Sequence, residues 1–169
     1  TEDYISPMAV AGDAGLQYQT TGLTHSEMGS PALDFETQQI THEKRWHKLL
    51  PLCQREDLVK LFGEPDCPTG IITWGSAAPI VVETVNFLGL QDKVTVCVPE
   101  LVYPLPDRLR KFVKSIEKLL VIEMNYSGQF YHYLRSQLDL PAKTRLYCRV
   151  GGRPFSKKEL SPLIMEIVR

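Results

Sequence analysis

Two turns carry the residue types in this chain that are best suited to binding or chemistry. Each follows an apolar run, and together they hold small, hydroxyl and amide side chains: Gly75, Ser76, Asn125, Ser127, Gly128 and Gln129. Turns of this composition that open a helix leave backbone N–H groups able to receive an anion such as a phosphate. We therefore predict that these six residues surround one crevice, which serves either as a binding site or as an interface.

A nucleotide fingerprint is present only in degenerate form. Gly75 is followed by Ala77 and Ile80 where a dinucleotide-binding turn would have its other two glycines, and Glu100 follows the next apolar run. A tight turn with a capped helix explains this pattern as well as a phosphate site does. An independent nucleotide-binding or interaction module with a Rossmann-like fold is therefore kept as the alternative function.

The acidic residue Glu123 lies late in an apolar run. In that position it is either a buried acid with a role in catalysis or a ligand for neighbouring backbone groups, which is the common role of acids at strand ends. No nucleophile elbow, phosphate-binding loop or other self-contained catalytic set occurs in the sequence. We therefore assign no catalytic and no cofactor-binding residue to this chain.

The histidines and cysteines of the chain do not have the spacing that is typical of metal ligands. His42 and His47 are five residues apart, which places them about 140° from each other around a helix and prevents them from sharing a metal. The cysteines contain no Cys-x-x-Cys pair, and Cys97 and Cys148 are predicted to be buried thiols within strands. We therefore assign no metal site and no iron–sulfur cluster to this chain.

The predicted elements alternate between strand and helix from residue 69 onward. The predicted strands are 71–74, 94–98, 119–124 and 146–150, and the helices are 77–88, 107–118, 127–138 and one that begins at the capping box 156–159. Ser76 is predicted to cap the first of these helices. Four strand-helix units in succession predict an α/β fold with a mainly parallel sheet and helices on both faces.

The strand order follows from the apolar patterns. The run 119–124 is apolar almost throughout, as a central strand is, whereas 146–150 alternates as a half-exposed strand does. The predicted order of these four strands is therefore second, first, third, fourth. This order makes the two turns neighbours at one edge of the sheet, beneath two helix N-termini.

The N-terminal third differs in composition. Residues 1 to about 34 are rich in glycine, proline, serine and threonine, without sustained periodicity, and are predicted to form an extended arm. A helix over about 34–50 follows, capped by Asp34 and with a partly apolar face. We predict two parts: an arm with a connecting helix over 1–50, and an α/β domain over 51–169.

The overall composition narrows the function classes. The chain has 43% hydrophobic residues, 23% charged residues and a formal net charge of -1, which is typical of a globular domain and gives no electrostatic footprint for nucleic acid. No apolar run is long enough to span a membrane, and no secretory signal is evident. We therefore predict a cytoplasmic protein without nucleic-acid or membrane partners.

Five segments together resemble a known family. They are residues 5–12, 21–29, 43–45, 74–76 and 121–129, and their order and spacing resemble the C-terminal part of the α subunit of 2-oxoacid:ferredoxin oxidoreductases, with the 2-oxoglutarate type closer than the pyruvate type. The chain departs from the family pattern at Thr24, where an acidic residue is usual, and at Met8, where a basic residue is usual.

The resemblance implies a fold and a place in a complex. The fold would be that of the transketolase C-terminal domain, a three-layer α/β/α sandwich whose five-stranded, mostly parallel sheet has one antiparallel strand, for which 58–62 is the candidate. The complex would convert a 2-oxoacid, coenzyme A and oxidised ferredoxin to acyl-CoA, CO2 and reduced ferredoxin. The resemblance further implies that thiamine diphosphate, Mg and iron–sulfur clusters are bound elsewhere in the complex, outside this region.

The resemblance also names the partners. They would be the remaining α-subunit domain, the β subunit and other oxidoreductase subunits, with ferredoxin and coenzyme A bound by the complex. This region would then be a non-catalytic assembly domain that is inactive when isolated. Its arm and its crevice edge would pack against the rest of the complex.

Overall fold

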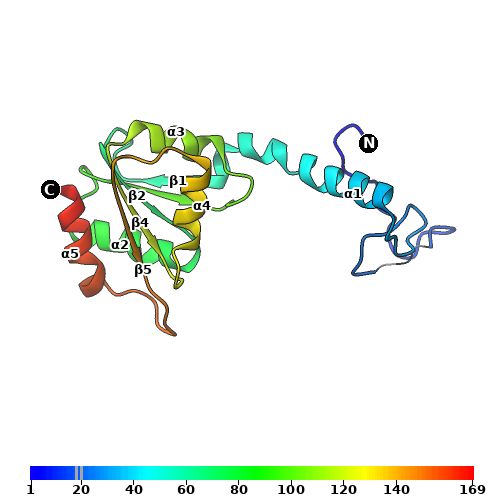
Figure 1. Cartoon of the computed structure of the whole chain (residues 1–169). Coiled ribbons are helices and arrows are strands. Elements are labelled where there is room, and N and C mark those ends of the chain that lie inside the picture. The colour runs from blue at the N-terminus through cyan, green and yellow to red at the C-terminus, as the bar shows by residue number, and fades with distance from the viewer. Residues whose placement is uncertain (18, 20) are drawn as a thin grey trace. The chain divides into compact units, whose positions relative to one another are not determined.

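The computed structural model describes residues 1–17, 19 and 21–169 (Figure 1). The elements follow in the order α1 (Phe35–His47), the 3-10 helices Leu50–Gln54 and Glu56–Leu58, β1 (Val59–Phe62), β2 (Thr69–Thr73), the 3-10 turn Gly75–Ala77, α2 (Ala78–Phe87), β3 (Thr95–Pro99), α3 (Asp107–Ser115), β4 (Lys118–Glu123), α4 (Gln129–Gln137), β5 (Lys143–Cys148) and α5 (Lys157–Val168). Among the described residues, no helix is both long and apolar enough to cross a membrane.

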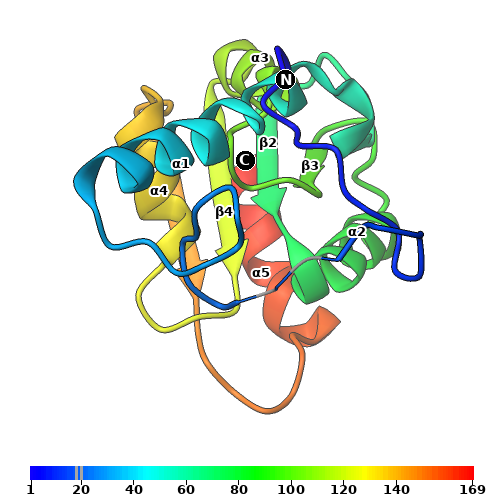
Figure 2. The ribbon, with the colours of Figure 1, turned by 90° about the vertical axis from the view of Figure 1, so that its right-hand side faces the viewer.

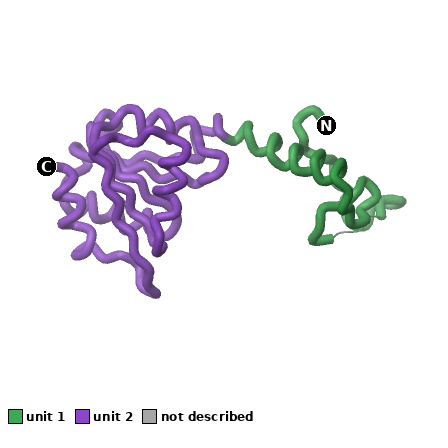
Figure 3. The backbone as a smooth tube through the Cα atoms, in the orientation of Figure 1, with its two compact units in different colours: residues 1–52 green, residues 53–169 purple. Residues whose placement is uncertain are grey.

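The chain divides into two compact units, residues 1–52 and 53–169 (Figure 3). In the first unit, helix α1 begins as predicted at Asp34, whose carboxylate accepts a hydrogen bond from the backbone N–H of Thr37 at 2.7 Å. The arm lies against this helix. Arg45 donates to the hydroxyl of Thr24 at 3.1 Å, and the rings of Tyr4 and His47 stack with centroids 4.8 Å apart.

Helix α1 contains no buried residue. The partly apolar face predicted for it is therefore not covered within the first unit, where Phe35 is 83% exposed. Since burial of an apolar face supplies most of the stability of a helix in a protein, α1 depends on its cap and on the polar contacts of the arm.

The second unit is built on one five-stranded sheet in the order β1-β3-β2-β4-β5. Figure 2 shows β3, β2 and β4 in that order. Strands β2 to β5 are parallel to one another, and β1 pairs antiparallel with β3. The predicted α/β fold class, the strand order and the antiparallel strand near 58–62 are therefore confirmed.

Helices cover the two faces of the sheet in pairs. Helices α2 and α5 pack over one face, on a core that includes Ile71, Leu120 and Ile164, and they also contact each other (Figure 2). Helices α3 and α4 cover the other face, on a core that includes Ile72 and Val121. Coverage of both faces explains why every residue of β2 is buried and why β4 is apolar almost throughout.

Most helix and strand boundaries differ from the prediction by a few residues, and helix α3 ends at Ser115 rather than near residue 118. Helix α2 begins at Ala78 after a 3-10 turn, and its N-cap residue is Ala77, without a side-chain cap, so the predicted capping role of Ser76 is wrong. Helix α4 begins at Gln129 rather than Ser127. Strand β5 covers Lys143–Cys148, and Val150 beyond it is 61% exposed.

Candidate functional site

The two predicted turns lie next to each other at the carboxyl edge of the sheet. Strands β2 and β4 are paired in parallel, with Thr73 opposite Ile122, so both strands end at the same level. The rings of Trp74, after β2, and Phe130, in the first turn of α4, are 5.8 Å apart and tilted. The topology therefore brings together the two segments that the sequence separates by about fifty residues.

The buried residue at this edge is Glu123. Its side chain is fully enclosed, and its carboxylate accepts hydrogen bonds from the backbone N–H groups of Phe130 at 2.9 Å and Tyr131 at 3.0 Å. The amide of Asn125 donates to the same carboxylate at 2.5 Å. Glu123 thus occupies the place at the N-terminus of α4 where an external anion would bind.

Asn125 and Gly128 complete this cap. The side-chain oxygen of Asn125 accepts from the backbone N–H of Gln129 at 3.0 Å. Gly128 is the N-cap residue and has a left-handed backbone, with φ 65° and ψ 46°. A Cβ atom at this position would lie 2.6 Å from a methyl group of Leu146, so both the backbone angle and the available space require glycine here.

The other predicted site residues lie on the surface of the edge. Gly75, Ser76, Ser127 and Gln129 are exposed, and Gly75 has φ 58°. The turn at Gly75 leads into one 3-10 turn rather than directly into an α-helix. Of the two helix N-termini expected to receive an anion, that of α4 is therefore closed by Glu123, and that of α2 is preceded by an extra turn.

Sequence reasoning missed three exposed apolar side chains on this edge. Trp74 is 37% exposed after β2, Tyr126 is 86% exposed after β4, and Val150 is 61% exposed beyond β5. All three follow the carboxyl ends of parallel strands. An aromatic residue among the turn residues that follow a buried strand is the signal that could have identified Trp74 and Tyr126, whereas Val150 carries no such signal.

A diphosphate does not fit this edge. The buried carboxylate of Glu123 already satisfies the first N–H groups of α4, and its negative charge repels a second anion. This edge therefore has the composition of a packing surface, with Glu123 as an internal cap of α4 and with exposed apolar side chains at Trp74, Tyr126 and Val150. We derive no catalytic step at this edge through a phosphorylated cofactor.

A polar cluster fixes the loop that leads from β5 into α5. The guanidinium of Arg149 binds the carboxylate of Glu159 with bonds of 2.5 and 3.0 Å, and the hydroxyl of Tyr147 donates to it at 2.7 Å. Glu159 also forms the predicted capping box with Ser156. Chiefly through the bonds from Arg149, this cluster lowers the pKa of Glu159 to about 2.

The pH dependence of stability tests this cluster. Because the pKa of Glu159 in the fold lies below its ordinary 4.5, its contribution is complete above about pH 4.5 and is lost as pH falls toward 2. We expect Glu159→Gln to lower the free energy of unfolding by about 1 to 2 kcal/mol at neutral pH and by progressively less below pH 4.5. Urea unfolding at several pH values measures this.

The control for this measurement is Glu117→Gln, which changes an exposed acid outside the cluster. Its effect on the free energy of unfolding should be small and should be the same at every pH. A Glu159→Gln variant whose loss of stability is the same at pH 3 as at pH 7 would contradict the assigned role.

The cysteines are only partly as predicted. Cys97 is fully buried in β3, and burial raises the pKa of its thiol. Cys148 is only half-buried, because β5 is an edge strand, so its prediction as a buried thiol is wrong. Within the described part of the chain, no group of three or more histidine, cysteine, aspartate or glutamate residues is placed to hold a metal ion.

Comparison with known proteins gives consistent matches along the whole chain. It is 30% identical over 174 residues to the 2-oxoacid:ferredoxin oxidoreductase subunit alpha of Saccharolobus solfataricus, a match that covers 100% of this chain and 27% of the relative. It is 29% identical to the 2-oxoglutarate synthase subunit KorA of Methanocaldococcus jannaschii, covering 95% of this chain and 43% of the relative. No family model matches the sequence.

A solved structure agrees with these matches. The 2-oxoglutarate:ferredoxin oxidoreductase from Magnetococcus marinus, solved with 2-oxoglutarate, coenzyme A and succinyl-CoA bound, matches 100% of this chain with a TM-score of 0.80 and 31% identity. The match covers 30% of that chain. The present chain therefore spans less than half the length of these relatives.

Proposed function

From the homology of the whole chain to a region of the α subunit of 2-oxoacid:ferredoxin oxidoreductases, we propose that it is a non-catalytic assembly domain of such an α subunit. The observation that carries this proposal is the large amount of apolar surface that the chain leaves uncovered in two places. Exposed apolar surface of this extent is typical of protein interfaces.

The first uncovered surface lies on the first unit. Met28 and Leu33 are each 87% exposed and Phe35 is 83% exposed, all within eight residues of sequence. In a free domain these side chains would remain in contact with water, which is unfavourable for apolar surface. A partner surface would bury them and remove this unfavourable hydration. The arm is therefore proposed to pack against another domain of the α subunit.

The second uncovered surface is the carboxyl edge of the sheet, with Trp74, Tyr126 and Val150. The closure of the α4 N-terminus by Glu123 favours packing over ligand binding here. The residues Gly75, Ser76, Asn125, Ser127, Gly128 and Gln129 are accordingly proposed to shape an interface. Aromatic side chains at the centre of an interface usually contribute most of its binding energy.

In this proposal the chemistry belongs to the complete assembly, which also includes the rest of the α subunit, the β subunit and other oxidoreductase subunits. The assembly would convert a 2-oxoacid, coenzyme A and oxidised ferredoxin to acyl-CoA, CO2 and reduced ferredoxin. Thiamine diphosphate, Mg and iron–sulfur clusters would be bound elsewhere in the assembly and would supply the decarboxylation and electron transfer. The isolated chain would be inactive.

Co-expression tests the proposal. The chain is produced together with the rest of an α subunit and a β subunit from the same source, and 2-oxoglutarate-dependent, CoA-dependent reduction of ferredoxin is measured. The triple variant Met28→Ser, Leu33→Ser, Phe35→Ser should leave the α/β unit folded and reduce co-purification with the partners by about tenfold or more. Reductase activity should fall with the amount of assembled complex.

The matched control changes the polar neighbours Glu27→Ser, Ser30→Ala and Glu36→Ser, which are also exposed. It should co-purify as the unchanged chain does. Thiamine-dependent decarboxylation by the isolated chain would refute the proposal. Tight, saturable binding of an adenine nucleotide by the isolated chain in calorimetry would favour the alternative of an independent nucleotide-binding module.

The genetic context offers a simpler observation. A neighbouring coding sequence that supplies the remaining α-subunit domain and a β subunit would support the assembly role. A coding region that holds this chain as a complete product, without either of them nearby, would contradict it.

A further inference from the structure

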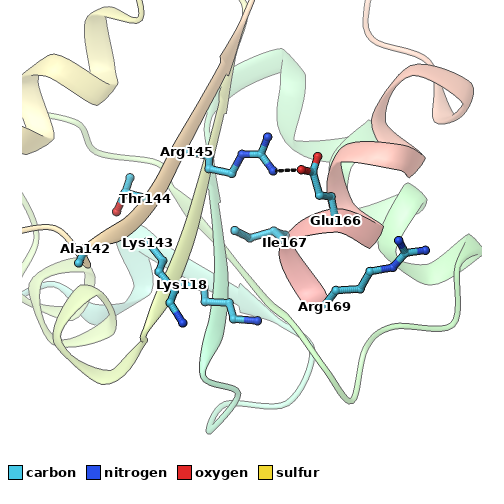
Figure 4. Close-up of a pocket in the computed structure, with 8 residues that line it drawn as sticks. All are labelled: Lys118, Ala142, Lys143, Thr144, Arg145, Glu166, Ile167 and Arg169. Carbon is cyan, nitrogen blue, oxygen red and sulfur yellow. Dashed lines mark ion pairs between the residues drawn. The ribbon is translucent and has the colours of Figure 1, made fainter.

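A hollow lies at the edge of the sheet opposite the carboxyl ends of the parallel strands, where β4 and β5 begin and α5 ends (Figure 4). Its volume is about 540 Å³. It is lined by the residues Lys118, Ala142, Lys143, Thr144, Arg145, Glu166, Ile167 and Arg169. The lining contains four basic side chains and one acidic side chain, in a chain whose formal net charge is -1.

The two lysines are direct neighbours across the sheet. Lys118 is the first residue of β4 and pairs in register with Lys143, the first residue of β5. In Figure 4 their ammonium groups extend to the same side. Like charges at directly opposed positions of neighbouring strands destabilise a sheet. The repulsion between these two lysines therefore lowers the stability of the sheet. The fold itself does not require lysine at both positions.

The remaining charges of the hollow have local explanations. Arg145 reaches across to Glu166 on α5 and forms an ion pair of 2.6 Å (Figure 4). Arg169 follows the C-terminus of α5, where a cation interacts favourably with the helix dipole. Within the described part of the chain, neither Lys118 nor Lys143 takes part in an ion pair.

We propose that this hollow binds a phosphate-bearing ligand through Lys118 and Lys143. Lysine ammonium groups bind phosphate as point charges, and two adjacent ones match the two charged groups of a diphosphate. A bound diphosphate would replace the repulsion between the lysines by two attractive contacts. The volume of the hollow lies in the range of small-ligand sites. None of the residues that line this hollow belongs to the proposed assembly surfaces.

Titration with inorganic pyrophosphate at low ionic strength tests the site, with the full chain as the protein. We expect saturable binding at one site, with backbone amide shifts in NMR spectra confined to the starts of β4 and β5 and the end of α5. The double variant Lys118→Gln, Lys143→Gln should weaken binding by at least about tenfold.

The matched control is Lys114→Gln, Lys158→Gln, which removes the same charge from two exposed lysines outside the hollow. Its affinity should stay within about twofold of the unchanged chain. Equal weakening in both variants would mean that net charge alone attracts pyrophosphate, and it would overturn the proposal. Absence of saturation would overturn it too, and so would citrate binding as tightly as pyrophosphate.

A stability measurement separates binding from a structural role. Because the lysines repel each other, the double variant Lys118→Gln, Lys143→Gln should be at least as thermostable as the unchanged chain at low salt, and pyrophosphate should raise the melting temperature of the unchanged chain only. A double variant that melts at a lower temperature without ligand would show that the lysines support the fold, and would overturn the proposal.

Discussion

Replacing Glu123 by alanine is expected to lower the free energy of unfolding by about 3 kcal/mol, because it leaves buried donors unsatisfied and creates a cavity. The carboxylate is fully enclosed and accepts from two backbone N–H groups of α4 as well as from the Asn125 amide. Alanine supplies no acceptor to any of them. Urea unfolding, followed by circular dichroism, measures the loss.

Glu123→Gln is the sharper test of the same contact. Glutamine preserves the size of the side chain but has only one acceptor oxygen, so its amide nitrogen must face either the N–H of Phe130 or that of Tyr131. We expect a loss of about 2 kcal/mol, larger than the roughly 1 kcal/mol expected for Asn125→Ala at the half-buried end of the cap. A Glu123→Gln variant as stable as the unchanged chain would exclude the capping role.

Replacing Gly128 by alanine is expected to cost about 2 to 3 kcal/mol, from two separable causes. One is the left-handed backbone at φ 65°, and the other is the contact that a Cβ atom would make with Leu146 at 2.6 Å. Gly75 provides the comparison, since it has φ 58° but no neighbouring atom within 4 Å of the place that a Cβ atom would take. Gly75→Ala should therefore cost only about 1 kcal/mol.

A double-mutant cycle tests whether the contact with Leu146 explains why Gly128→Ala should cost more stability than Gly75→Ala. Leu146→Ala removes the side chain that meets the new methyl group, so the Gly128→Ala change should cost less in that background than in the unchanged chain. Equilibrium unfolding of the four proteins gives the coupling energy, expected at about 1 kcal/mol. Purely additive losses would mean that the backbone angle alone requires glycine.

The sheet could be predicted because its strands differ in pattern. The nearly continuous apolar run of β4 is required by helices on both faces, and the alternation in β5 reflects its place at the edge. Together with the turn residues at Gly75 and Gly128, these patterns led to the observed strand order. The capping box at Ser156 was predictable for a similar reason, because its hydrogen bonds are local in sequence.

The details of the carboxyl edge of the sheet could not be predicted in the same way. Whether Glu123 faces solvent, a ligand or backbone depends on where α4 begins, and that is decided by the left-handed turn at Gly128 and the space beside Leu146. The exposure of Cys148 and Tyr126 likewise depends on which strand ends the sheet and on how far each loop extends. The orientation of Glu123 and the exposure of these two side chains are set by packing between segments that are distant in sequence. The local periodicity of the sequence carries no information about such packing.

The capping of α4 by Glu123 also has an evolutionary consequence. The spacing Glu-x-Asn-x-x-Gly, from 123 to 128, encodes an anion receptor together with the anion that fills it. One nucleotide change at the glutamate codon could empty that receptor, exchanging part of the stability of the domain for an open position that a foreign carboxylate or phosphate could occupy.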